Sequence, residues 1–247
     1  MSIQNIKTAH LVHDIKNPVN IIESGARSLL DKPDRYGQLN PKQEKVIRRM
    51  LRNAMRLRHL ANGMLEVDMA ALGVLNVVDC TLSQILRTAL VELFDLIDPV
   101  VSDALEEATA LEKFISILKA NDVTLEANPV HLDRKIHIDE TKMALIITNL
   151  LSNAFKYRNK CVNVRAALNN DTLEIAVKDD GPGIPETYHQ QIFNSYFQCD
   201  KIEGFPVRGH GLGLAGALAL AGAMGGSLSI CKCPHGAEFV VHVKVCP

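Results

Sequence analysis

The sequence predicts an α+β protein in which a helical-hairpin domain is followed by an α/β sandwich domain. Two observations lead to this fold class. Apolar residues recur at helical spacing over residues 5–30 and again over residues 41–70, and from residue 76 onward short strand patterns alternate with helices. The expected domains therefore cover residues 1–75 and 76–247.

Length and composition fit a folded soluble protein. Of the 247 residues, 47% are hydrophobic and 22% are charged, enough for one large domain or two ordinary ones. A formal net charge of −1 and the lack of tryptophan argue against a nucleic-acid partner. Residues 1–12 lack the apolar core of a signal peptide, and the longest apolar run, residues 211–226, is short for a membrane span of about 20 residues. We therefore expect a cytoplasmic protein whose chain has no membrane span.

Two amphipathic helices make up the first domain. Asn40-Pro41 predicts the start of the second helix, with asparagine as the N-cap and proline at the first helical position. An isolated hairpin cannot bury the apolar stripes of both helices, so we expect a homodimer in which the helices over residues 5–30 and 41–70 form a four-helix bundle. The two stripes consist of Leu11, Ile15, Ile22, Ala26 and Leu29, and of Met50, Ala54, Leu57, Ala61, Met64 and Leu65.

The second domain mixes strands and helices. Two hairpins are indicated by the turn residues Asn169-Asn170-Asp171 and Pro234-His235-Gly236. Helices interleaved with such hairpins imply a mixed sheet covered by helices. The expected strands cover residues 75–80, 123–127, 135–139, 162–168, 172–179, 227–233 and 237–245, and the expected helices cover residues 82–97, 99–119, 140–157 and 212–224.

The long helix over residues 140–157 carries a group of polar side chains near its end. Asn149, Asn153 and Lys156 share one helix face, and Tyr157 follows. A carboxamide oxygen can coordinate Mg²⁺, a lysine can bind phosphate and a tyrosine ring can lie on a purine. The alternative is a helix end whose polar residues are only solvated.

Two glycine-rich segments follow. "DDGPGIP", residues 179–185, comes directly after a strand, and its Gly-x-Gly lets the backbone approach a ligand closely. An ordinary turn is the alternative. "GHGLGLAGALA", residues 209–219, leads into a helix whose N-terminal N–H groups favour phosphate oxygens. It differs from the dinucleotide fingerprint because it has no βαβ unit with a following acidic residue.

Together and in this order, the three segments resemble the N, G1 and G2 boxes of the GHKL (Bergerat-type) ATPase superfamily. "NLLSNAFKY", "DDGPGIP", "IFNSYFQ" and "GHGLGLA" are most similar to the catalytic domain of two-component sensor histidine kinases. The resemblance implies ATP and Mg²⁺ as cofactors, with Asn153 binding the metal, Asn149 beside it, Lys156 contacting phosphate and Tyr157 contacting adenine. Asp179 would accept a hydrogen bond from the adenine amino group.

The same resemblance implies further nucleotide-binding positions and shows two departures. An added helix around residues 98–118 is either a structural elaboration or a partner surface, and Arg158 stands where the family often has a small hydroxyl residue. The further implied positions are Gly181, Gly183, Ile184, Phe193, Phe197, Gly209, Gly211, Leu212, Gly213 and Leu214.

The segment "HDIKNP", residues 13–18, lies in the first predicted helix. On a helical wheel, His13 falls roughly opposite Leu11 and the apolar stripe, so it faces outward. A solvated surface histidine is the alternative. The segment is similar to the H box of HisKA-type histidine kinases, and this implies a dimerisation and histidine phosphotransfer domain with His13 as the phosphoacceptor.

The neighbours of His13 suit this chemistry. Asp14 can accept the second imidazole N–H and stabilise charge on the ring, and Asn17 can orient water or the phosphoryl group. In the family the position of Asn17 also matters for dephosphorylating the partner. Pro18 lacks an N–H, so the carbonyl of Asp14 loses its helical partner and the helix is expected to bend.

The resemblance implies an ATP-dependent protein histidine kinase that phosphorylates His13 and passes the phosphoryl group to an aspartate on a response-regulator receiver domain. Two alternatives stay open: a histidine phosphotransferase or scaffold with a weakened ATP site, and a GHKL ATPase that acts as a conformational switch. The intact N, G1 and G2 boxes argue against the first, and the H box argues against the second. The second helix has a basic outer face that is either solvated or a docking surface for an acidic receiver domain; it consists of Lys45, Arg48, Arg49, Arg52, Arg56 and His59.

Overall fold

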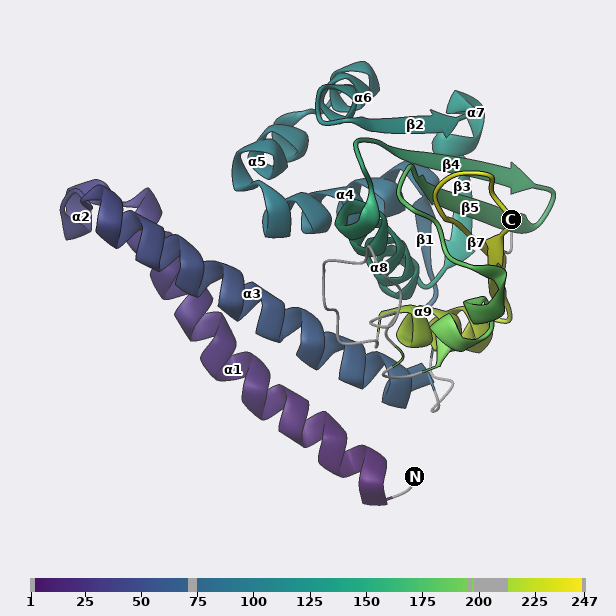
Figure 1. Cartoon of the computed structure of the whole chain (residues 1–247). Coiled ribbons are helices and arrows are strands. Elements are labelled where there is room, and N and C mark those ends of the chain that lie inside the picture. The colour runs from purple at the N-terminus through teal and green to yellow at the C-terminus, as the bar shows by residue number, and fades with distance from the viewer. Residues whose placement is uncertain (1–2, 71–74, 195–196, 198–212, 246–247) are drawn as a thin grey trace. The chain divides into compact units, whose positions relative to one another are not determined.

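The chain divides into two compact units, Met1–Asp68 and Met69–Pro247, whose elements are labelled in Figure 1. The computed structural model describes residues 3–70, 75–194, 197 and 213–245. For residues 3–14, 16, 52, 56, 59–60 and 62–70, which lie in the two long helices of the hairpin, it describes the backbone but not the side chains.

The first unit is a helical hairpin. Helix α1 (Ile3–Asp31) continues through Pro18, and the short α2 (Pro33–Tyr36) leads to α3 (Pro41–Ala70). The start of α3 is as predicted, because Asn40 Oδ1 accepts hydrogen bonds from the backbone N–H groups of Lys42 and Gln43 at 3.0 and 2.9 Å.

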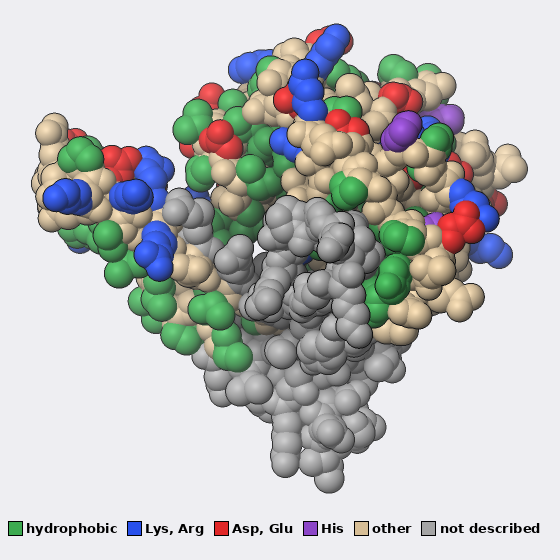
Figure 2. All heavy atoms as spheres, in the orientation of Figure 1, with side chains coloured by type: hydrophobic (Ala, Val, Ile, Leu, Met, Phe, Trp, Pro, Cys, Tyr) green, Lys and Arg blue, Asp and Glu red, His purple; other side chains and the backbone are tan. Residues whose placement is uncertain are grey.

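The α1–α3 contact buries only part of the apolar surface of the hairpin. Three members of the predicted stripes, Ile22, Met50 and Leu57, are 50, 55 and 49% exposed. Figure 2 shows hydrophobic side chains, in green, at the surface of the hairpin. A single copy therefore leaves large apolar side chains in water. Among the described side chains of the hairpin, the buried apolar ones are Val19, Ala26, Leu51, Ala54, Met55 and Ala61.

The second unit is an α/β sandwich, as predicted. Its five-stranded sheet has the order β2-β4-β5-β7-β6, with β2 parallel to β4 and the other pairs antiparallel. The strands of this sheet are β2 (Val123–Ala127), β4 (Val162–Asn169), β5 (Thr172–Asp179), β6 (Ser227–Cys231) and β7 (Glu238–Lys244). A separate antiparallel pair joins β1 (Val78–Thr81) to β3 (Lys135–Ile138).

Helices α4 (Leu82–Ile97), α8 (Glu140–Tyr157) and α9 (Gly213–Ala223) carry the other half of the core. Helix α8 contacts β4 and β5, α9 contacts β6 and β7, and both α4 and α9 pack on α8 (Figure 1). Asp139 is the N-cap of α8, and its carboxylate accepts hydrogen bonds from the backbone N–H groups of Lys142 and Asn76 at 3.0 and 2.9 Å. Two short 3₁₀ helices, η1 (Glu186–Tyr188) and η2 (Gln191–Phe193), follow β5.

The prediction of one added helix around residues 98–118 was wrong, because this region forms α5 (Pro99–Glu107) and α6 (Leu111–Ala120). Arg87 of α4 explains the break. Its guanidinium donates to the carbonyl oxygens of Ala108 and Thr109 at 2.6 and 3.4 Å and lies 4.3 Å from the centre of the Phe114 ring. Carbonyls at the end of α5 are thus satisfied by a side chain rather than by a further helical turn.

Two smaller differences concern β1 and α7. Strand β1 covers residues 78–81 rather than 75–80, and the short helix α7 (Pro129–Leu132), which the sequence pattern did not indicate, is capped by Asn128. In the part of the chain that the structure describes, no helix combines the length and the apolar character needed to cross a bilayer.

Candidate functional site

Helix α8 presents the predicted polar group. Asn149 is buried, with 3% of its surface exposed, and Asn153, one turn later, is half-buried. The Nζ atom of Lys156 donates to the hydroxyl of Tyr157 at 2.7 Å and lies 4.5 Å from the centre of its ring. The C-terminal half of α8 thus offers two carboxamides and a cation along one side.

Asp179 lies at the end of β5 and is buried, with 5% of its surface exposed. Its Oδ1 accepts hydrogen bonds from the backbone N–H groups of Gly181 and Ala237 at 2.8 and 3.3 Å. Burial raises the pKa of Asp179 above the usual 3.8, although these two hydrogen bonds oppose the rise. Within the described residues, Oδ2 receives no hydrogen bond, so this oxygen can accept one from a ligand.

The G1 glycines allow a close approach of backbone segments. A Cβ atom on Gly181 would lie 2.1 Å from the carbonyl oxygen of Tyr157, so a side chain at this position would separate the segment from the end of α8. Gly183 has φ +75°, and a Cβ there would lie 2.8 Å from the carbonyl oxygen of Gly236. The segment therefore lies between the end of α8 and the β6–β7 turn. Ile184 packs against the core.

The start of α9 lies beside α8. A Cβ atom on Gly213 would lie 3.2 Å from Asn149 Oδ1, so the first residue of α9 meets the buried carboxamide of the N box. Leu214 packs against the core. Gly209, Gly211 and Leu212 lie outside the described residues. The described part of the site thus brings α8, the segment after β5 and the N-terminus of α9 together, as the three motifs predict.

The two predicted phenylalanines pack against other rings of the second unit. The Phe193 ring lies 6.3 Å from the Phe239 ring, almost perpendicular to it, and the Phe197 ring lies 5.9 Å from the Tyr188 ring. Both phenylalanines contact the core. These contacts anchor the segment that leads away from G1.

Sequence reasoning missed the part played by Asp180 and left Arg158 open. Asp180 accepts hydrogen bonds from the backbone after α8, and its position directly after Asp179 at a strand end is the signal that could have found it. The guanidinium of Arg158 lies 3.9 Å from the centre of the Phe155 ring and donates to the carbonyl oxygen of Asn121 at 3.4 Å.

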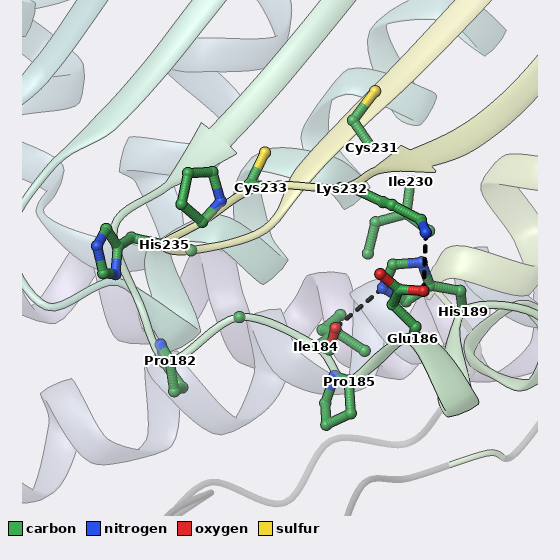
Figure 3. Close-up of a pocket in the computed structure, with 13 residues that line it drawn as sticks. Pro182, Ile184, Pro185, Glu186, His189, Ile230, Cys231, Lys232, Cys233 and His235 are labelled. Atoms are coloured by element: carbon green, nitrogen blue, oxygen red, sulfur yellow. Dashed lines mark hydrogen bonds and ion pairs between the residues drawn. The ribbon is translucent and has the colours of Figure 1, made fainter.

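Figure 3 shows a separate cavity of about 240 Å³ between the G1 segment and the β6–β7 turn. At one end of it, Lys232 and Glu186 form an ion pair at 2.8 Å, and His189 contacts the carbonyl oxygen of Ile184 at 2.9 Å (Figure 3). Its lining includes the predicted residues Gly183 and Ile184 but none of the predicted residues of α8.

The predicted phosphoacceptor lies in the first unit. His13, Asp14 and Asn17 all belong to α1, and Asn17 and Pro18 are exposed. The side chains of His13 and Asp14 lie outside the described ones, so the outward direction of the imidazole stays a prediction.

Two family models match the chain, and together they cover more than half of it. Residues 7–71 match the His Kinase A (phospho-acceptor) domain, and residues 138–247 match the histidine kinase-, DNA gyrase B-, and HSP90-like ATPase. The chain belongs to the histidine kinase family. The first unit of this histidine kinase core holds the phosphoacceptor domain, and the second holds the ATPase-type domain.

Several curated histidine kinases are similar to this one. The sensor histidine kinase YkoH of Bacillus subtilis is 26% identical over 88% of this chain and 42% of its own length. The aerobic respiration control sensor protein ArcB of Escherichia coli is 30% identical over 88% of this chain and 25% of its own length. The chain therefore spans less than half of these relatives.

Solved structures share the fold. Full-length ShkA, crystallised in complex with AMPPNP, matches with a TM-score of 0.63 and 23% identity, over 97% of this chain and 45% of that one. The Acinetobacter baumannii histidine kinase AdeS matches with a TM-score of 0.55 and 15% identity, over 94% of this chain and 97% of that one.

Proposed function

We propose that this chain is an ATP-dependent protein histidine kinase core that phosphorylates His13 and passes the phosphoryl group to an aspartate on a response-regulator receiver domain. One observation carries the proposal. The residues of the N, G1 and G2 motifs that the structure describes meet in one site, in a chain whose α1 also carries the H-box histidine.

The second unit would bind ATP. Asp179 Oδ2 would accept a hydrogen bond from the adenine amino group, because the buried carboxylate is already held through Oδ1. Tyr157 would contact the adenine from the end of α8, and Lys156 would contact phosphate oxygens. The N-terminus of α9, beside Asn149, would favour the negative charge of the phosphates.

The residues of α8 also fit a Mg²⁺ ion. Mg²⁺ takes oxygen ligands and keeps several waters, so one neutral carboxamide such as that of Asn153 is enough protein ligation when phosphates supply the rest. Asn153 is half-buried and one turn from Asn149, which places it on the side of α8 that meets α9. When bound, the ion would neutralise phosphate charge and help to align the γ-phosphoryl group.

His13 would be the nucleophile. Near neutral pH an imidazole is largely uncharged, and the lone pair of one ring nitrogen can form a bond to the γ-phosphorus as the bond from that phosphorus to the ADP oxygen breaks. The positive charge left on the ring would be stabilised by Asp14, which can accept the other ring N–H. Most of the catalysis would come from positioning the two reactants and from charge stabilisation.

The first unit would also form the homodimer. The half-exposed side chains of Ile22, Met50 and Leu57 need a cover, and a second hairpin would bury them in a four-helix bundle. The basic outer face of α3 would meet an acidic receiver domain. Two of its members with described side chains, Arg48 and Arg49, are exposed.

Incubation of the chain with γ-labelled ATP and Mg²⁺ tests the proposal. We expect a protein-bound label that is labile in acid and stable in base, as a phosphorus–nitrogen bond requires, and we expect none in His13→Ala. ATP hydrolysis without protein label would contradict the kinase and favour a conformational-switch ATPase. Failure to bind ATP would favour a phosphotransferase or scaffold.

A panel of purified receiver domains tests the second step. Labelled chain should transfer its label within minutes to one or a few receivers and much more slowly to the others, because recognition of the partner is selective. Asn17→Ala should reduce dephosphorylation of that receiver more than it reduces labelling of His13. Equal losses in the two rates would remove the separate role given to Asn17.

A further inference from the structure

The G1 segment is held from two sides. On one side, the backbone N–H of Asp179 donates to the carbonyl oxygen of Ala237 at 3.0 Å. The backbone N–H of Gly236 donates to the carbonyl oxygen of Gly181 at 3.1 Å. On the other side lie residues 158–160, which directly follow the end of α8. We call these three residues the strap. The β6–β7 turn and the strap thus bracket the segment that carries Asp179.

Asp180 joins the strap to the G1 segment. Its Oδ1 accepts hydrogen bonds from the backbone N–H groups of Asn159 and Lys160 at 2.9 and 3.0 Å, and its Oδ2 lies 3.1 Å from the same Lys160 nitrogen. The side-chain amide of Asn159 donates in return to the carbonyl oxygen of Asp180 at 2.6 Å. Hydrogen bonds to an ionised carboxylate are shorter and stronger than neutral ones.

The charge of Asp180 is stable at neutral pH. Its slight burial would raise the pKa, but hydrogen bonds from the backbone of Lys160 and Cys161 outweigh this and hold the pKa of Asp180 below the usual 3.8. The neighbouring Asp179 shows the opposite shift, because its deeper burial raises its pKa. Two adjacent aspartates are therefore held in different environments, one facing the strap and one facing the core.

Arg158 holds the other end of the strap. It donates to Asn121, at the start of the turn before β2, and stacks on Phe155 within α8 itself. The strap is thus tied to α8 and to the α6–β2 turn. Directly before it, the carbonyl oxygen of Tyr157 meets Gly181 at a distance that leaves no room for a side chain. Any movement of the strap would therefore change the spacing between Tyr157 and the G1 segment.

We propose that Asp180 is a positioning residue for the nucleotide, which holds Asp179 and Gly181 against the end of α8 through the strap. The proposal rests on the proposed function, in which Tyr157 and Asp179 contact the same adenine. These two residues come from separate elements, and Asp180 supplies the side-chain link between them. Asp180 itself contacts no reacting atom, so its effect would fall on nucleotide affinity rather than on the phosphoryl transfer step.

The test compares Asp180→Ala and Asp180→Asn with a control, Asp103→Ala, in the full chain. Asparagine keeps an oxygen that can accept the strap N–H groups but loses the charge. Asp103 is exposed on α5 and gives the same change in charge and size away from the site. Three quantities are measured: the dissociation constant of ATP with Mg²⁺, hydrogen exchange at the amides of Asn159 and Lys160, and the unfolding temperature.

For Asp180→Ala we expect ATP to bind about tenfold more weakly, since charge-assisted hydrogen bonds are lost. We expect exchange at the Asn159 and Lys160 amides to become at least about tenfold faster. Asp180→Asn should lose about threefold or less in affinity, because its oxygen rescues part of the contact. The rate of His13 phosphorylation at saturating ATP should stay within about twofold in both, and Asp103→Ala should match the wild type.

Three results would overturn the proposal. Unchanged ATP affinity in Asp180→Ala together with faster amide exchange would make Asp180 a structural contact alone. Unchanged exchange would show that the strap is held by other groups. Failure of the wild-type chain to bind ATP would overturn the proposed function and this proposal together, whereas normal wild-type binding with unchanged Asp180→Ala affinity overturns the positioning role alone.

Discussion

The two units of the chain differ in how completely each buries its own apolar side chains. The sandwich encloses a core in which Leu90, Ile147 and Ile175 are fully buried. The hairpin leaves Ile22, Met50 and Leu57 about half in water. We therefore expect the hairpin, rather than the core of the sandwich, to need a second copy to complete its packing. The chemistry proposed for the chain follows the same division, with the donor site in the sandwich and the acceptor histidine in the hairpin.

Replacing one leucine by alanine in each unit tests this difference most directly. Leu90→Ala removes a fully buried side chain, and we expect the free energy of unfolding of the sandwich to fall by about 2–5 kcal/mol. Calorimetry of the full chain would show the loss in the transition of the second unit. An effect below about 1 kcal/mol would contradict the tightly packed core.

Leu57→Ala should act on association instead. About half of this side chain remains to be buried by a partner, and the change occurs once in each of two copies, so dimerisation should weaken by about 2 kcal/mol, or about 30-fold. Sedimentation equilibrium measures the dissociation constant. The transition of the sandwich should not move, and a monomeric wild-type chain would rule out the expected role of this surface.

An ion pair inside the hairpin gives a second test of this difference, because it places a charged group among the apolar contacts between α1 and α3. Glu23 is buried, and its Oε1 lies 3.1 Å from Arg58 of α3 and 3.6 Å from Arg27 of α1. Arg58→Ala leaves the carboxylate poorly paired, and we expect a loss of about 1–2 kcal/mol, less than for a fully buried pair because Arg58 is partly exposed.

Arg49→Ala is the matched control. It removes an exposed arginine from the same helix as Arg58 and leaves the pair with Glu23 in place, so its cost should stay below about 0.5 kcal/mol. Thermal unfolding at fixed protein concentration, followed by the helical circular dichroism signal, compares the two variants. Equal losses of stability in the two variants would show that the ion pair between α1 and α3 makes no specific contribution.

Asp179→Asn should have the smallest effect on stability, and above the folded pKa of Asp179 it should stabilise the fold rather than destabilise it. The pKa of Asp179 is raised in the folded state, so the folded protein binds this proton more tightly than the unfolded chain does. Wild-type stability should therefore fall as the pH rises from 3.8 through the folded pKa, and asparagine, which keeps the acceptor oxygen, should remove that fall. As the pH falls through the same range, the wild type should lose ATP affinity, because protonation of Asp179 removes the charged acceptor for the adenine amino group.

Urea unfolding of both chains across the pH range measures the difference. With rising pH, the free energy of unfolding of Asp179→Asn should increase relative to that of the wild type. Above the folded pKa of Asp179, the difference should stay constant in favour of Asp179→Asn. A growing disadvantage over this range would mean that the carboxylate stabilises the fold rather than serving a ligand.

The sequence predicts much of this organisation from local patterns. The N-cap at Asn40, the limits of α4 and α8 and both hairpin turns depend on neighbouring residues, and the structure confirms them. The break between α5 and α6 was missed because it depends on Arg87, more than twenty residues earlier in the chain. A contact over that separation leaves no periodic signal in the segment itself.

The candidate site divides in the same way. Asn149, Asp179 and Gly213 were predicted from motifs, and the structure brings their elements together. The contacts of Asp180 with the strap could not be predicted, because they join two loops that meet only after β4 and β5 have paired. The roles assigned to Asn153, Lys156 and His13 stay predictions.

One paired measurement tests the division between donor and acceptor units most directly. His13→Ala and Asn153→Ala are each assayed for ATP binding with Mg²⁺ and for acid-labile label on the protein. The account predicts that His13→Ala binds ATP like the wild type and carries no label, and that Asn153→Ala loses both. A labelled His13→Ala chain, or an Asn153→Ala chain with wild-type binding and label, would contradict it.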